Sequence, residues 1–109
     1  LLEGVLHDLV HLAIQLDGTL LARGTPTDPI TFTSNAALPA RGDWGYLLFT
    51  NTSADAAFDP DGNYLSGSIL EYCTVEYAGS ANNSAVRLQS SSPFIRQCTI
   101  RNNLNKYLT

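Results

Sequence analysis

The chain of 109 residues contains no methionine, only two cysteines and few charged residues. Because it lacks an initiating methionine, we expect a processed product or a segment of a longer protein. Two cysteines are too few for a disulfide scaffold, and their spacing is not that of a metal site. Charged residues make up 15% of the chain and the net charge is −4, which leaves no basic surface for nucleic acid.

Long apolar runs and tight hairpin signals are also missing. No run reaches the roughly 18 apolar residues of a membrane span. A sandwich or barrel built from hairpins needs two-residue Asn-Gly or Asp-Gly turns between its strands. One Asp-Gly pair, Asp17-Gly18, stands a short turn before an apolar strand, and the alternation of residues continues through it. The sequence therefore predicts one domain over residues 1–109 that is not made of hairpins.

Apolar and polar residues alternate with a period of two along most of the chain, which indicates β-strands. The alternation covers residues 10–23 and then the short segments "PITFTS", "WGYLLFT", "SILEYCTVEY", "SAVRLQS" and "PFIRQCTIRN". The start of the chain also fits helical spacing. Residues 1–15 are therefore predicted to form either a short helical cap or a first coil.

One of these segments recurs further along the chain. Residues 68–77, "SILEYCTVEY", return in altered form as residues 93–102, "PFIRQCTIRN", at an offset of 25. A repeat of this length predicts a solenoid of about four coils, each stacked on the one before. Leu47 and Val86 are predicted to be equivalent inward positions, and the additional residues between them are assigned to an inserted loop at 51–64.

The two copies keep their apolar positions and reverse the sign of their charges. Glu71 aligns with Arg96, and Glu76 aligns with Arg101. In a parallel stack, such residues lie about 4.8 Å apart, where opposite charges attract and like charges repel. We therefore expect each glutamate to pair with its arginine on the outer face of the solenoid.

Cys73 and Cys98 also align in the repeat. At an inward position they would form a ladder of thiols, since cysteine behaves as a small buried apolar residue. Parallel strands hold the two Cβ atoms near 4.8 Å, beyond the range of about 3.5–4.5 Å that is usual in disulfides. This geometry favours free thiols, with a disulfide as the alternative.

Several of these segments resemble a known family. "GTLLARGTPTDPITFTS", "GDWGYLLF" and the two motifs C-T-V and C-T-I are similar to right-handed parallel β-helix proteins of the pectin-lyase-like superfamily. More narrowly, they resemble β-helix repeats of large secreted or cell-surface bacterial proteins. The resemblance covers about residues 16–103 and implies an all-β, right-handed parallel β-helix in an extracellular location. It leaves the activity open, because the superfamily includes lyases, hydrolases, epimerases, adhesins and scaffolds.

Few acidic residues lie on the predicted strands, and they are not grouped. Lyases of the resembled superfamily combine a calcium-binding carboxylate cluster with a basic residue, and its hydrolases use grouped aspartates. The strand acids here are Asp17, Glu71 and Glu76, two of which are expected to pair with arginine. We therefore predict a structural or binding module without catalytic activity or cofactor. The enzymatic alternative is a fragment of a polysaccharide lyase or glycoside hydrolase.

Aromatic residues at the start of one strand suggest a carbohydrate-binding surface as another alternative. Trp44 and Tyr46 flank Gly45, and Arg87 points outward from "SAVRLQ". An outward aromatic pair can stack on a sugar ring, although such residues also fill the edge of a core.

The inserted loop suggests a calcium site. Its oxygen-bearing side chains are those of Asp55, Asp59, Asp61 and Asn63. Calcium takes six to eight oxygen ligands, usually including a bidentate carboxylate, whereas Asp and Asn beside Pro and Gly also form ordinary turns. The ligand count favours turns, with calcium as the alternative.

The ends of a short solenoid predict its partners. An uncapped end exposes apolar core and unpaired backbone groups, and the segment after residue 101 is too short to cover a coil. We expect either further coils of the same polypeptide or identical copies stacked end to end, a contact that can propagate into a filament. Polysaccharide is a third candidate partner.

Overall fold

The computed structural model describes residues 13–105 and residue 109, and these residues form strands, turns and one short 3-10 helix. The 3-10 helix η1 covers Ser80–Asn82. The strands are β1 Ile14–Leu16, β2 Leu21–Arg23, β3 Ile30–Phe32, β4 Leu47–Phe49, β5 Ala57–Phe58, β6 Tyr64–Ser66, β7 Ile69–Glu71, β8 Cys73–Glu76, β9 Val86–Leu88, β10 Phe94–Arg96 and β11 Thr99–Arg101.

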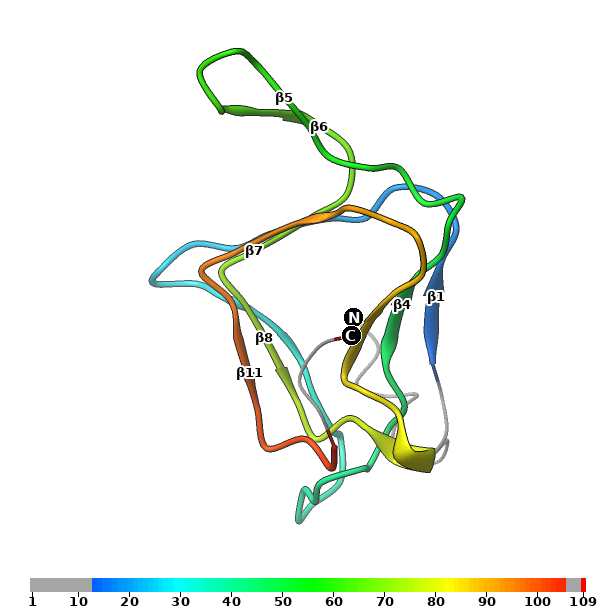
Figure 1. Ribbon diagram of the computed structural model, residues 1–109. Helices are drawn as coiled ribbons and strands as arrows, with labels where there is room; N and C mark the ends of the chain where they lie inside the picture. The colour runs from blue at the N-terminus through cyan, green and yellow to red at the C-terminus, as the bar shows by residue number, and fades with distance from the viewer. Residues whose placement is uncertain (1–12, 106–108) are drawn as a thin grey trace.

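Nine of the strands form three parallel sheets, in the orders β1-β4-β9, β2-β7-β10 and β3-β8-β11. The chain passes through one strand of each sheet and then repeats, so that the sheets form the three sides of the coil in Figure 1. Parallel strands joined in this way confirm the predicted all-β parallel β-helix. Three rows of strands are described. The predicted helical cap or first coil lies largely in residues 1–12, outside the described residues.

The register follows the repeat read from the sequence. Leu70 lies beside Ile95, and Val75 lies beside Ile100, as the offset of 25 predicts. Leu47 also pairs with Val86, as predicted. Stacking requires these inward positions to stay similar in size and polarity, since each side chain rests on the equivalent one in the neighbouring coil.

The corners of the coil are as regular as its strands. Tyr72 between β7 and β8 has φ 52°, and Gln97, its equivalent between β10 and β11, has φ 51°. A second pair of equivalent corners, Tyr77 and Asn102, has φ 62° and 55°. Residues other than glycine seldom adopt this left-handed region. The stacked coils therefore impose the same backbone bend at each level.

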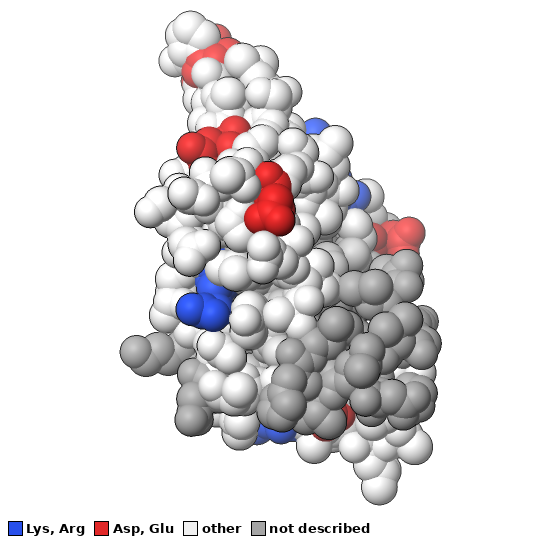
Figure 2. All heavy atoms as spheres, turned by 90° about the vertical axis from the view of Figure 1, so that its right-hand side faces the viewer, with Lys and Arg blue, Asp and Glu red and all other residues white. Residues whose placement is uncertain are grey.

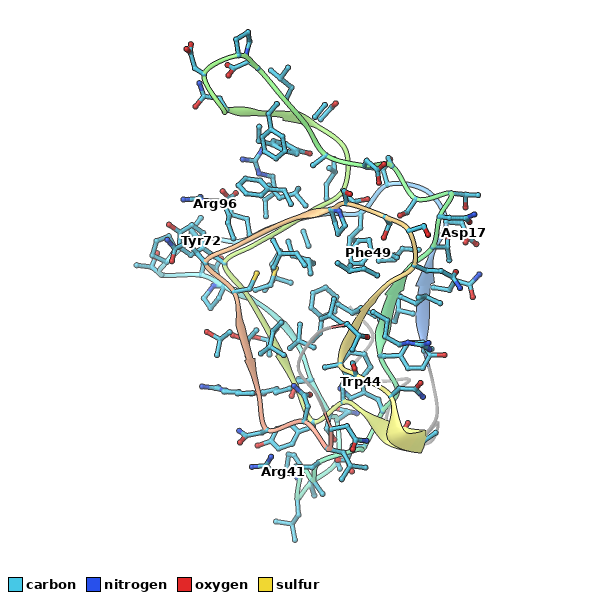
Figure 3. The ribbon with its side chains drawn as sticks, in the orientation of Figure 1. Asp17, Arg41, Trp44, Phe49, Tyr72 and Arg96 are labelled. Atoms are coloured by element: carbon cyan, nitrogen blue, oxygen red, sulfur yellow. The ribbon has the colours of Figure 1, made fainter. Side chains whose placement is uncertain are left out.

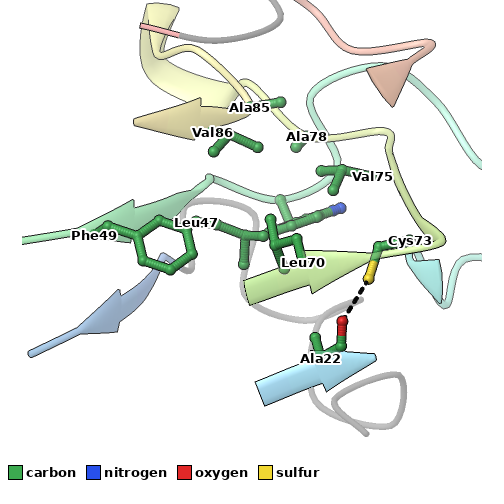
Figure 4. Packing of buried hydrophobic residues seen from close by; sticks show 10 residues of the cluster. Ala22, Leu47, Phe49, Leu70, Cys73, Val75, Ala78, Ala85 and Val86 are labelled. Atoms are coloured by element: carbon green, nitrogen blue, oxygen red, sulfur yellow. Dashed lines mark hydrogen bonds between the residues drawn. The ribbon is translucent and has the colours of Figure 1, made fainter. Parts of the chain in front are cut away.

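The core runs along the axis of the coil. Its fully buried residues come mainly from the middle coil, and they include Leu47, Phe49, Leu70 and Val75. Figure 4 shows these side chains converging between the sheets, with the Cys73 thiol donating to the backbone oxygen of Ala22. Most other apolar residues of the first and third coils pack against this cluster and are only partly buried, whereas Ala22, Ala85 and Val86 belong to the buried cluster.

One connection leaves the coil. Between β4 and β7 the chain projects outward as an antiparallel hairpin of β5 and β6. Phe58 and Tyr64 of this hairpin pack against Phe94 of β10, with ring centroids 5.0 and 6.2 Å from that of Phe94. Gly67 at the base of the hairpin has φ 96°, and a Cβ there would lie 2.0 Å from the backbone oxygen of Asp55. The hairpin is thus anchored to the outer face of β10.

No helix among the described residues has the length and apolar character needed to cross a membrane.

Candidate functional site

The outer face of the sheet β2-β7-β10 carries a column of three charged residues, one glutamate between two arginines. Arg23, Glu71 and Arg96 stand beside one another on adjacent strands. Arg23 Nε donates to Glu71 Oε1 at 2.9 Å, and Arg96 Nη1 donates to Glu71 Oε2. These two arginines hold the pKa of the Glu71 carboxyl below its usual value of 4.5. Glu71 is therefore a carboxylate that two arginines bind from opposite sides.

A second column runs along the outer face of β3-β8-β11. Arg101 Nε donates to Glu76 Oε1 at 3.1 Å, and the Thr33 hydroxyl donates to Glu76 Oε2 at 2.8 Å. Both oxygens of this glutamate are thus bound by neighbouring coils. The glutamate–arginine pairs expected from the repeat are present in both columns.

The remaining strand-associated acid, Asp17, is also bound within the chain. Its Oδ1 accepts a hydrogen bond of 2.7 Å from the Thr50 hydroxyl and another from Gln15 Nε2. Figure 2 shows the side of the molecule that holds β1 and β4, where acidic residues gather toward the projecting hairpin and basic residues are sparse. The acidic side chains Glu71 and Glu76 of the described strands are thus bound by arginines of neighbouring coils, and Asp17 is bound by Thr50 and Gln15. They do not form a free acidic cluster.

For Trp44 and Tyr46 the sequence left two alternatives, an outward pair or aromatic residues at the edge of the core, and Trp44 takes the second. The indole is fully buried, and its Nε1 donates to the backbone oxygen of Glu76 at 2.8 Å. Figure 3 shows Trp44 and Phe49 inside the coil, whereas Tyr72 and Arg96 lie outside. Trp44 is placed before β4, in the corner where alternation no longer decides which face a residue occupies.

Tyr46 and Arg87 do lie together on the outer surface. The Arg87 guanidinium stands over the Tyr46 ring at 4.9 Å from its centroid, and both side chains are half-buried. A guanidinium at this distance is attracted by the electrons of the ring face. Tyr46 and Arg87 are thus the members of the predicted carbohydrate-binding set that lie on the surface, whereas Trp44 is buried.

The hairpin acids form turns and do not converge on one point. Asp59 Oδ1 accepts the backbone N–H groups of Asp61 and Asn63, and Asp59 Oδ2 accepts from Asn63 Nδ2 at 3.1 Å. The hydrogen bonds from Asn63 lower the pKa of Asp59. Asp55 instead accepts the backbone N–H of Ser92 at 2.8 Å. Among the described residues, no three His, Cys, Asp or Glu side chains are grouped closely enough to hold a metal ion.

Cys73 and Cys98 are free thiols in neighbouring coils. Cys73 donates to the backbone oxygen of Ala22 at 3.3 Å, and Cys98 donates to that of Leu70 at 3.2 Å. The hydrogen bond with Cys98 and burial raise the pKa of Cys73. A buried thiol with a raised pKa is a poor nucleophile, so Cys73 serves the packing of the core.

A family model described as a pectate-lyase-like beta helix domain matches residues 3–99. The chain belongs to this family. Searches among curated proteins and among solved structures found no match. Membership in the pectate-lyase-like β-helix family agrees with the resemblance seen in the sequence and with the parallel sheets. The family includes enzymes, and membership alone does not make this chain one.

Two residues that stabilise this pectate-lyase-like β-helix were not identified from the sequence. The pairing of Arg23 with Glu71 was missed because the glycines of "GTLLAR" and "GSILEY" suggest an alignment that is one residue off. The strands pair Leu21 with Ile69, which brings Arg23 beside Glu71. Asn103 was also missed. It is buried, its Oδ1 accepts from the Ala78 N–H at 2.7 Å, and its Nδ2 donates to the Val75 oxygen. The available signal was the position of Asn103 directly after the corner residue Asn102.

Proposed function

We propose that this chain is a structural β-helix module of a secreted or cell-surface protein and has no catalytic role. The observation that carries the proposal is the use of the strand-face carboxylates. Glu71 and Glu76 are each bound by arginine from a neighbouring coil, and Asp17 is bound by Thr50. These side chains contribute to holding the coils in register.

The electrostatics of Glu71 support this assignment. A general acid needs a proton near neutral pH, which enzymes achieve by raising the pKa of a carboxyl. The two arginines lower the pKa of Glu71, so it stays ionised and paired. A general base must reach a substrate proton, whereas both Glu71 oxygens already accept from arginine. The arrangement suits stacking better than proton transfer.

The proposed location and partners rest on the sequence resemblance and on the outward-facing residues of the coil. The resemblance to repeats of secreted and surface proteins supports an extracellular site of action. The outward positions of β1, β3, β8 and β11 carry Gln, Thr and paired charges, which suit contact with water, whereas Leu21, Ile69 and Phe94 form an apolar column on the sheet β2-β7-β10. The proposed partners are further coils of the same polypeptide or identical copies stacked end to end.

An assay with acidic polysaccharide tests the absence of catalysis. The chain is incubated with pectate and polygalacturonate, with and without calcium, beside an active pectate lyase as the positive control. We expect no unsaturated product and no new reducing ends. Turnover that disappears in Glu71→Gln or Asp59→Asn, and is retained in Asp61→Asn, would establish an active site and overturn the proposal.

A second candidate function is carbohydrate binding, which the stacked pair of Tyr46 and Arg87 favours. Arginine held over an aromatic ring can present its free N–H groups to hydroxyl or carboxylate oxygens of a glycan. The test is binding to immobilised acidic and neutral glycans. Tyr46→Ala and Arg87→Ala should each weaken binding about threefold to tenfold. Gln15→Ala, in the same outward column as Arg87, is the matched control and should leave binding unchanged.

A further inference from the structure

The third coil has strand edges that no described strand covers. β10 and β11 are the last strands of their sheets in the described part of the chain. Their inward residues Ile95 and Ile100 are only partly buried. The equivalent residues of the middle coil, Leu70 and Val75, are fully buried. Within the described residues, Ile95 and Ile100 therefore lack the cover that another coil provides to the middle one.

Thr109 lies where the next coil would begin. Its N–H donates to the Val86 oxygen at 3.0 Å, and its oxygen accepts from the Leu88 N–H at 2.7 Å. A residue bonded to both neighbours of Arg87 in this way stands beside Arg87 in a parallel ladder. The sheet that ends in β9 is thus already extended by one residue in the register of the other coils.

The charged columns end in arginine at this same side. Arg96 and Arg101 keep 38% and 59% of their side chains exposed. The next position in each column lies about 4.8 Å further on. A carboxylate there would bind the arginine from its open side, as Glu71 does between two arginines, whereas a basic residue would repel it.

We propose that the outer edges of β10 and β11 receive a further β-coil, continuing from Thr109, that places Asp or Glu beside Arg96 and beside Arg101. The proposal rests on the structural function above and specifies its partner. These edges favour a continuing coil over a second copy, since head-to-tail stacking of the described residues would put the copy's Arg23 beside Arg96, where two basic residues repel each other. The copy's β1 would also require the position beside β9 that Thr109 occupies.

Added coils test the charge rule directly. Residues 88–102 are repeated after Thr109 in three forms: unchanged, with glutamate at the two positions that repeat Arg96 and Arg101, and with glutamine there. The melting temperature of each is compared with that of the 109-residue chain at low salt. We expect the glutamate form to melt highest, roughly 4–8 °C above the unchanged form. The difference should shrink at high salt, because salt screens exposed charges.

Hydrogen exchange provides a second measurement. The N–H of Phe94 donates to the Ser68 oxygen at 2.9 Å, so that of Ile95 faces the uncovered edge, since successive N–H groups of a strand alternate in direction. The glutamate coil should slow exchange at Ile95 about tenfold or more by pairing with it. The unchanged coil should protect this amide less.

Each result bears on a different part of the proposal. Equal melting and equal protection from the glutamate and unchanged coils would overturn the requirement for carboxylates. No gain from any added coil would overturn the docking edge itself. Head-to-tail filaments of the 109-residue chain, detected by sedimentation and electron microscopy, would overturn the choice of a continuing coil over identical copies. Failure of the structural function would instead appear as substrate turnover in the polysaccharide assay.

Discussion

The middle coil of this pectate-lyase-like β-helix, formed by β4, β7 and β8, and the third coil, formed by β9, β10 and β11, carry similar inward side chains in the same columns. They differ in what lies on either side. Leu70 is fully buried between Ala22 and Ile95, whereas Ile95 has a described neighbour on one side only. The ion pairs differ in the same way: Glu71 is bound by an arginine on each side, whereas Arg96 has a described glutamate partner on one side. A coil therefore owes its burial and its ion pairs to both of its neighbours.

The largest expected difference between the two coils is the loss of stability when equivalent inward residues are truncated to alanine. Leu70→Ala removes a fully buried side chain and should lower the free energy of unfolding by about 2–5 kcal/mol. Ile95→Ala removes a partly buried one and should cost about half as much or less, because part of the side chain already contacts water. Chemical denaturation measures both. A larger cost for Ile95→Ala would contradict the account.

An intermediate effect is expected from reversing charges in one outer column. Glu76→Arg alone would place a second arginine beside Arg101 and should destabilise the chain, because the two like charges repel. Combining it with Arg101→Glu restores an opposite pair and should recover much of the loss. Denaturation of the two single variants and the double variant gives the coupling. Purely additive costs would show that these side chains do not act on each other.

The smallest expected effect is the pH dependence that Glu71 contributes. Its pKa is lowered in the folded chain, so its contribution to stability is fully present above the usual value of 4.5 and is lost as pH falls through the folded value. Glu71→Gln should therefore flatten the fall in stability at acid pH. Asp61→Asn removes one exposed hairpin carboxylate instead and is the control. An unchanged acid limb in Glu71→Gln would contradict the assigned ion pairs.

The repeat carried most of the predictable information, because stacking forces equivalent inward positions to match. The pairs Leu70–Ile95 and Val75–Ile100 could be read from the offset alone, and the sign reversal at Glu71 and Arg96 pointed to the same register. These predictions rely on neighbours that are related by a regular repeat. They hold for β7 with β10 and for β8 with β11, because no inserted segment changes the offset of 25 between these strands.

Where the chain departs from the repeat, the sequence was a poorer guide. Arg23 could not be matched to Glu71, since the hairpin between β4 and β7 lengthens the spacing and the glycines suggest a register one residue off. Trp44 occupies a corner, where period-two alternation does not say which face is inward. The roles of these residues depend on contacts that are distant in sequence and do not recur.

The most direct test of the account compares two backbone amides by hydrogen exchange in the 109-residue chain. Leu70 lies in a strand paired on both sides, and its amide should exchange at a rate close to that set by global unfolding. The Ile95 N–H faces the uncovered edge of β10 and should exchange far faster, although its side chain stands in the same column. Equal protection of the two amides would contradict the claim that the third coil is an open edge.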